Sequence, residues 1–222
     1  MASITLTVLR ARVRERADMV GSSFVADTAT GLDAWINEAN QKLHGMLVDA
    51  MGEEYVSSSA SFTTIAGTSD YAVPAGFYKL YGVDLDFHGI MRALKQYTRA
   101  ERNTFKDLYP EFLPRYSLVG TNIRLYPIPS AGLTGAILYA PEATTLSSGS
   151  DTVSYPNGWE RFIVIDAAIQ ALAKEESNTS TLVAERVAII KEIEQTKEMR
   201  DLATPKRVVD LEVAESFRED WW

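Results

Sequence analysis

Three side chains with metal-binding chemistry alternate along one segment of the chain, at Asp84, Asp86 and His88. Alternate side chains of an extended strand point to the same face, so the two carboxylates and the imidazole would lie together. They would form a reasonable ligand set for a divalent metal ion. The competing interpretation is that the apolar residues between them are buried while the three polar residues face water. We expect no metal centre, and this triad is the candidate to test.

Other features of a catalytic site are missing from the sequence. The chain has no cysteine, which excludes disulfides, thiolate chemistry and cysteine zinc sites. It contains neither a Gly-rich phosphate loop nor a Gly-x-Ser-x-Gly nucleophile motif. The second histidine, His44, follows Leu43 at the edge of an apolar helix face, and we interpret it as structural. The sequence therefore predicts that the protein is not an enzyme and has no cofactor.

Four arginines form the main basic concentration of the chain, at Arg10, Arg12, Arg14 and Arg16. On a helix they make two i,i+4 pairs that flank an apolar stripe. One interpretation is a solvated helix edge. A second is an electrostatic contact with an acidic surface on a neighbouring subunit. Direct contact with DNA is the third.

The charge balance limits the partners that the protein binds. The chain carries 22 Lys+Arg and 30 Asp+Glu, a formal net charge of -8. Tight wrapping of nucleic acid needs basic surface that displaces phosphate counterions, so we expect DNA at most to pass close by. Residues 1–10 lack the apolar run of a signal peptide, and no window reaches the roughly 18 apolar residues of a membrane span. We expect a soluble protein made inside a cell, with no membrane partner.

Apolar residues at helical spacing predict two helices before residue 58 and two after residue 155. The first carries a stripe from Leu6 to Val20. The second carries a continuous apolar face over residues 32–50, with Thr30 available as its N-cap. The third begins at Pro156 and is apolar around most of its circumference, which predicts burial on several sides. The fourth carries an apolar stripe formed by Leu182, Val183, Val187, Ile190 and Ile193.

From about Ser58 the apolar period changes to two, which indicates strands. The longest strand is predicted over residues 77–87, with a partner over residues 91–97 after a turn. A hairpin is predicted over residues 116–126, in which Gly120 supplies the positive φ of a tight type II′ turn. A capping box at residues 98–101 predicts a short helix between these pairs.

These elements predict an α+β fold. A mainly helical bundle is formed by both chain ends, over residues 1–57 and 156–204. An antiparallel β-rich domain is inserted between them over residues 58–155. An extended C-terminal docking tail follows over residues 205–222, because Pro205 cannot extend the preceding helix.

The C-terminal tail combines an alternating segment with large aromatic residues. Buried aromatic groups dominate the energetics of interfaces, so this segment predicts a binding partner. Its alternating part is suited to adding a strand to that partner, and its aromatic part supplies anchors. The competing possibility is that the two tryptophans fold back onto their own chain. The residues predicted to dock are Val208, Val209, Leu211, Val213, Phe217, Trp221 and Trp222.

The order of these patterns along the chain resembles the head-to-tail connector, or adaptor, proteins of tailed bacteriophages. The segments that carry the resemblance are Trp35-Ile36-Asn37-Glu38-Ala39, residues 71–77, residues 115–120, residues 123–127, Pro156, Ala167-Ala168 and Lys174-Glu175-Glu176. They span nearly the whole chain and contain packing and turn residues without a catalytic signature.

The resemblance implies a structural protein of the virion neck, made in the host bacterial cytoplasm. Members of that family form a ring, commonly twelvefold, beneath the portal, extend the DNA channel and offer a platform to the tail. The resemblance also implies that the C-terminal segment reaches the portal. The β-rich insertion departs from the smaller connectors, which leaves open whether it meets tail proteins, a neighbouring subunit or both.

We therefore interpret the chain as a head-to-tail adaptor whose partners are the portal protein, tail proteins and further copies of itself. One alternative is a tail-completion or tail-tube protein of the same particle. Another is a metal-dependent enzyme that uses Asp84, Asp86 and His88.

Overall fold

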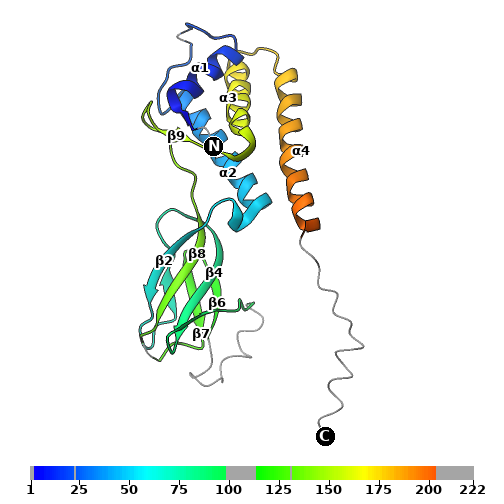
Figure 1. Ribbon diagram of the computed structural model, residues 1–222. Coiled ribbons are helices and arrows are strands. Elements are labelled where there is room, and N and C mark those ends of the chain that lie inside the picture. Colours follow the sequence, from blue (N-terminus) through cyan, green and yellow to red (C-terminus); the bar gives the residue numbers. More distant parts are fainter. Residues whose placement is uncertain (1–2, 23, 99–113, 131, 204–222) are drawn as a thin grey trace.

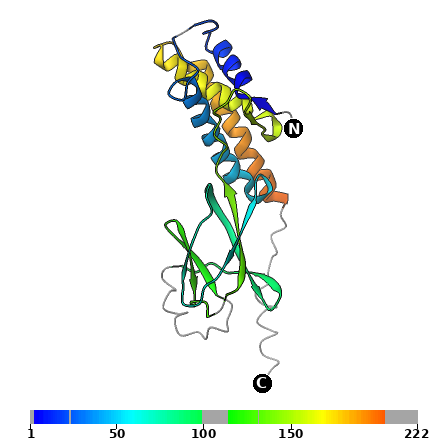
Figure 2. The same cartoon turned by 90° about the vertical axis from the view of Figure 1, so that its left-hand side faces the viewer.

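Helices lie at one end of an elongated molecule and β-sheets at the other, as Figures 1 and 2 show from two sides. The computed structural model describes residues 3–22, 24–98, 114–130 and 132–203. Within these residues the fold combines four α-helices with antiparallel sheets, which confirms the mixed α and β character predicted from the sequence. The short helix predicted over 98–101 and the tail over 205–222 fall outside the described residues, apart from Thr98.

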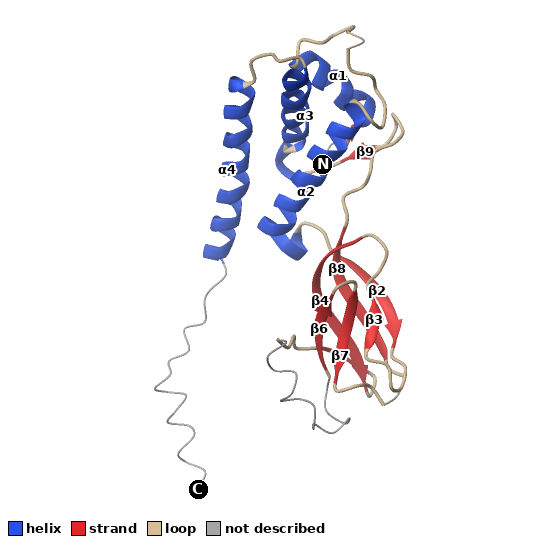
Figure 3. Cartoon of the chain, turned by 180° about the vertical axis from the view of Figure 1, so that it is seen from behind, coloured by secondary structure: helices blue, strands red, loops and turns tan. Residues whose placement is uncertain are grey.

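The helical end is built from segments before and after the β-rich region (Figure 3). The short 3₁₀ turn Gly52–Glu54 follows the second helix, where the chain leaves the helical end. The 3₁₀ turn Pro156–Gly158 precedes the third helix, where the chain returns to it. A small two-stranded sheet pairs β1 with β9 beside the helices. The bounds are α1 (Leu6–Arg16), α2 (Leu32–Met51), α3 (Glu160–Lys174), α4 (Ser180–Ala203), β1 (Ile4–Thr5) and β9 (Thr152–Val153).

The other end contains two antiparallel sheets. The four-stranded sheet has the order β2-β8-β4-β5, and the three-stranded sheet has the order β3-β7-β6. The bounds are β2 (Ser58–Thr63), β3 (Asp70–Ala72), β4 (Phe77–Phe87), β5 (Ile90–Ala93), β6 (Arg115–Val119), β7 (Asn122–Tyr126) and β8 (Thr134–Pro141). In the β6–β7 hairpin, Val119 pairs with Asn122 and Gly120 has a φ of 61°, which confirms the predicted tight turn.

The buried apolar residues form two separate clusters, one at each end. The first includes residues of all four helices, and α3 contacts α1, α2 and α4. On α3, Phe162, Ile163 and Ala167 are almost completely buried, which confirms the predicted burial on several sides. Each large apolar side chain buried in this way contributes roughly 1.5–3 kcal/mol to stability. The second cluster lies between the two sheets and includes Val83, Leu85, Ile123, Leu125 and Ile137.

One side of the β-sandwich is closed by the chain after β5. The Tyr97 N–H donates to the Tyr116 carbonyl at 2.9 Å, and the Tyr116 N–H donates to the Lys95 carbonyl at 3.1 Å. Residues 95–97 therefore connect the four-stranded sheet to the three-stranded one. This connection covers an edge that would otherwise expose unpaired backbone groups.

The first helix is shorter than the sequence predicts. It begins after Thr5, whose side-chain oxygen accepts a hydrogen bond from the Val8 N–H, and it ends at Arg16. Asp18 has a φ of 54°, a conformation that does not continue a right-handed helix. Val20 consequently lies outside the helix and is 76% exposed, so the prediction that it belongs to the apolar stripe is wrong.

The predicted N-cap of the second helix is also wrong. Gly31, not Thr30, precedes α2, and no side chain caps the helix there. The Ala26 carbonyl oxygen instead accepts a hydrogen bond from the Leu32 N–H at 3.0 Å. A Cβ atom on Gly31 would lie 2.3 Å from that oxygen. The loop backbone takes the place of a capping side chain, and its close approach requires glycine.

Two further details of the last helices differ from the prediction. Pro156 lies in a 3₁₀ turn in which Asn157 has a φ of 57°, so the α-helix begins only at Glu160. On α4, Ile189 is buried whereas Val187 is 43% exposed. The buried stripe of α4 consists of Leu182, Ile189 and Ile193.

Candidate functional site

The structure does not assemble the candidate metal site. Asp84 and Asp86 are half-buried on β4, but His88 lies in the following turn with a φ of 57° and is exposed. The turn takes His88 out of the alternation that the sequence argument requires. Within the described ranges no group of three or more His, Asp or Glu side chains is placed to hold a metal ion. Val83 and Leu85 are buried, as the competing interpretation expects.

The arginines of α1 make contacts within their own chain. Arg10 donates two hydrogen bonds to Asp33 at the start of α2, from Nε to Oδ1 at 2.7 Å and from Nη2 to Oδ2 at 2.8 Å. The carboxylate of Asp33 is almost fully buried, so it needs such a bidentate partner. The hydrogen bond to Asp33 raises the pKa of Arg10, against the opposing effect of desolvation.

Arg14 and Arg16 hold other parts of the helical end. Arg14 donates to the backbone carbonyls of Ser22 and Val25 and to the carboxylate of Asp27, which fixes the loop between α1 and α2. Arg16 forms an ion pair with Glu185 on α4. Among the four, Arg12 is exposed and has no polar partner in the described part of the chain. The predicted contact with a neighbouring subunit stays a prediction, and it now concerns Arg12 most directly.

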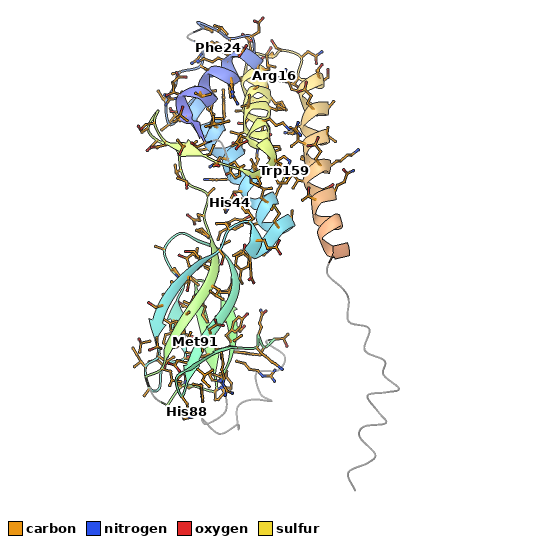
Figure 4. All side chains as sticks on the ribbon, in the orientation of Figure 1. Arg16, Phe24, His44, His88, Met91 and Trp159 are labelled. Carbon is orange, nitrogen blue, oxygen red and sulfur yellow. The ribbon has the colours of Figure 1, made fainter. Side chains whose placement is uncertain are left out.

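His44 on α2 lies where the helical end meets the β-rich end (Figure 4). It contacts the segment that leaves α2 and the segment that returns from β8. Its Nε2 lies 2.9 Å from the carbonyl oxygen of Pro141, at the end of β8. Its Nδ1 lies 3.2 Å from the hydroxyl of Tyr55, which follows α2. A carbonyl only accepts, so Nε2 carries the proton and Nδ1 accepts from Tyr55. Burial lowers the pKa of His44, although the bond to Pro141 opposes this shift.

The same face of α2 holds the loop that returns from the sheets after β8. Asn40 donates to the Thr144 carbonyl at 2.9 Å and accepts from the Tyr155 hydroxyl at 2.7 Å. Asn37 exchanges hydrogen bonds with the backbone of Leu146 at 2.9 and 2.8 Å. Burial raises the pKa of Tyr155 far above its usual value, so its hydroxyl stays protonated and donates. These contacts position the β-rich end relative to α2.

Asp166 on α3 is a second buried carboxylate of the helical end. It is 1% exposed and accepts hydrogen bonds from Lys42 at 3.1 Å and from Arg186 at 2.8 Å. Burial opposes the charged form of Lys42, but its hydrogen bonds to Glu38 and Asp166 outweigh this effect and raise its pKa. Asp166 therefore connects α2, α3 and α4 through one carboxylate.

A groove of about 390 Å³ lies beside this ion pair, between α2 and α4. Met46 from α2 and Ile190 from α4 contribute apolar walls, and both are only partly buried. Tyr78 from β4 also lines the groove and is 46% exposed. The groove therefore combines apolar walls with the cationic groups of Lys42 and Arg186.

Large apolar side chains are exposed at both ends of the molecule (Figure 4). Val20 and Phe24 lie in the loop between α1 and α2, and Phe24 is 48% exposed. At the other end, Ile90 and Met91 on β5 are 57% and 49% exposed. Such surface commonly marks interaction sites. The tail residues predicted to dock lie outside the described residues: Val208, Val209, Leu211, Val213, Phe217, Trp221 and Trp222.

The described residues thus form two separate buried clusters, with exposed apolar side chains at both ends. The chain matches the model of the SU10 adaptor protein family over residues 4–209. It belongs to this family of phage head-to-tail adaptors, which confirms the resemblance found in the sequence. No curated protein matches the chain. None of the helices in the described ranges is long and apolar enough to cross a membrane.

The sequence indicates a structural role for His44 but misses the other polar residues that fix the architecture. Asp33 and Asp166 were not singled out, because a lone aspartate in a helix is most often solvated. Asn37, Asn40 and His44 share one helix face at spacings of three and four, and this spacing was the available signal.

Proposed function

We propose that the protein assembles as a ring of twelve copies beneath the portal of a tailed phage, extends the DNA channel and offers the platform to which the tail attaches. The observation that carries this proposal is the family match, which covers residues 4–209. The exposed apolar side chains at both ends support it, because an adaptor needs a surface for each partner. The formal net charge of -8 is compatible with DNA sliding past without being held.

In this proposal the helices form the ring. Residues 1–57 and 156–204 act as one bundle, and residues 58–155 act as an inserted domain that faces a tail protein, a neighbouring subunit or both. The separation of the buried residues into two clusters supports this division. A ring subunit needs two different lateral faces. Arg12 on α1 and the exposed Val187 on α4 are candidates for such faces.

The tail over residues 205–222 is proposed to bind the portal. Its aromatic residues Phe217, Trp221 and Trp222 would supply the anchors, and residues 208–213 would add an extended strand. Deletion of residues 217–222 is expected to leave the fold intact and to abolish association with purified portal. Full co-assembly of the truncated protein would contradict this role.

A map of the particle neck obtained by electron cryomicroscopy tests the proposal as a whole. The expected result is a closed ring of this protein between the portal and the tail, with DNA on its axis. Density for this chain elsewhere in the tail would instead identify the alternative, a tail-completion or tail-tube protein.

A further inference from the structure

The groove between α2 and α4 has walls that suit an aromatic segment with acidic neighbours. Met46, Ile190 and Tyr78 present partly exposed apolar surface to it. Beside them stand two cationic side chains, Lys42 and Arg186, with one buried carboxylate between them. The Nε of Arg186 is buried and has no hydrogen-bond partner in the described part of the chain. A donor of this kind costs free energy until an acceptor reaches it.

The chain carries such a segment after its last helix. Residues 215–222 read Glu-Ser-Phe-Arg-Glu-Asp-Trp-Trp, with three aromatic rings and three carboxylates against one arginine. The rings match the apolar walls of the groove. Its two cations, Lys42 and Arg186, are already paired with Glu38 and Asp166, so the carboxylates of the segment add only a weak attraction and the apolar contact supplies most of the affinity.

The end of α4 is placed so that this segment reaches the groove. α4 ends at Ala203, on the side of the helical end nearest the sheets (Figures 1 and 3). Ile190 lies thirteen residues earlier, about 20 Å back along the helix at 1.5 Å per residue. Phe217 lies fourteen residues after Ala203, and an extended chain of that length spans about 45 Å. The connection therefore has ample length to turn back.

We propose that the aromatic end of the tail binds the α2–α4 groove of its own chain before assembly, and that the portal competes for the same aromatic side chains. The tail residues involved are Phe217, Trp221 and Trp222, and the groove residues are Met46, Tyr78, Ile190, Lys42 and Arg186. The competition with the portal rests on the proposed function, whereas the contact in the free protein does not. The groove thereby keeps large aromatic surface out of water until a portal is present.

The absence of cysteine from the chain makes the contact measurable by disulfide trapping. Gln41→Cys places a thiol on the groove, and Arg218→Cys places one among the tail aromatics. In dilute protein this pair is expected to form an intrachain disulfide at least tenfold faster than a control pair, Val20→Cys with Arg218→Cys. Equal rates for the two pairs would overturn the proposal.

Matched substitutions identify the groove as the binding site. Ile190→Asp, on the groove wall, is expected to abolish the rate advantage, whereas Val187→Asp, one turn earlier and exposed, is expected to preserve it. Circular dichroism checks that both variants fold. An effect of equal size from both variants would contradict the proposal, as would a disulfide that forms only between two different chains when singly substituted proteins are mixed.

The addition of portal tests the competition. The trapping rate is expected to fall as portal binds, and an unchanged rate in a complex that light scattering shows to be formed would overturn the competition. Light scattering also separates the two proposals, because an occupied groove without portal binding would contradict only the proposed function.

Discussion

The helical end and the β-rich end are held together by different means. At the helical end, two almost fully buried carboxylates, Asp33 and Asp166, each join separate helices through cationic partners. At the β-rich end, the ion pair between Asp70 and Arg124 joins neighbouring strands at the surface, with both side chains about two-fifths exposed. Backbone ladders already fix neighbouring strands, whereas a helix satisfies its own backbone and meets its neighbours only through side chains. Removal of the carboxylate of an ion pair should therefore lower the stability of the helical end more than that of the β-rich end.

The largest expected losses of stability come from truncating one buried leucine in each apolar cluster. Leu43→Ala in the helical cluster and Leu85→Ala in the β cluster should each lower the free energy of unfolding of their own end by about 2–5 kcal/mol. Trp35 and Trp159 belong to the helical cluster, so their fluorescence reports that end when the tail tryptophans are replaced by phenylalanine. Leu85→Ala should shift this signal less than Leu43→Ala does. Equal shifts would mean that the two ends unfold as one unit.

Removal of the buried Asp166 carboxylate should cause the next largest loss of stability. Asp166→Ala leaves Lys42 and Arg186 without their shared partner, and breaking such a pair costs about 3 kcal/mol. Denaturant unfolding followed by tryptophan fluorescence measures this loss. Asp49→Ala is the matched control, since its carboxylate is 67% exposed and pairs, among the described residues, with Lys79 alone, so its cost should stay below about 1 kcal/mol. Similar costs for both variants would refute the contrast between buried and exposed carboxylates on which the comparison of the two ends rests.

The junction between the ends should respond to pH. Because burial lowers the pKa of His44 below its ordinary 6.5, the unfolded chain binds this proton more readily than the folded one. The contribution of the neutral imidazole to stability is present above pH 6.5 and is lost as the pH falls toward the folded pKa. Unfolding measured between pH 5 and about pH 8 should show this loss, and His44→Gln should flatten it. A pH dependence that persists unchanged in the variant would assign it to another group.

The smallest effect is expected at the surface of the β-rich end. The hydrogen bond to Arg124 lowers the pKa of Asp70, so the pair contributes stability above pH 3.8 that is lost as the pH falls through the folded pKa. Solvent screens this exposed pair, and Asp70→Asn should cost less than about 1 kcal/mol. The cost should shrink further in high salt, as measured by urea unfolding. A larger loss than that of Asp166→Ala would reverse the comparison.

The sequence predicts the parts of this fold that follow from local pattern. The period of apolar residues gives the helices, the period of two gives the long hairpin, and Gly120 gives its tight turn. The errors at Val20 and Gly31 concern the ends of helices, where the positive φ of Asp18 and the Ala26 carbonyl of the preceding loop decide the boundary and the apolar period carries no signal. The buried carboxylates Asp33 and Asp166 were missed for a different reason, since their partners lie on other helices. Asp84, Asp86 and His88 are not brought together as the metal hypothesis requires, because the turn at His88 interrupts the strand.

The assembly state in the presence of portal decides whether this chain acts as an adaptor ring. Light scattering should be measured on this protein alone, on purified portal alone and on their mixture. The mixture should contain a complex whose mass exceeds that of the portal by a ring of copies of this chain. A chain that stays monomeric with portal present would rule out the adaptor ring.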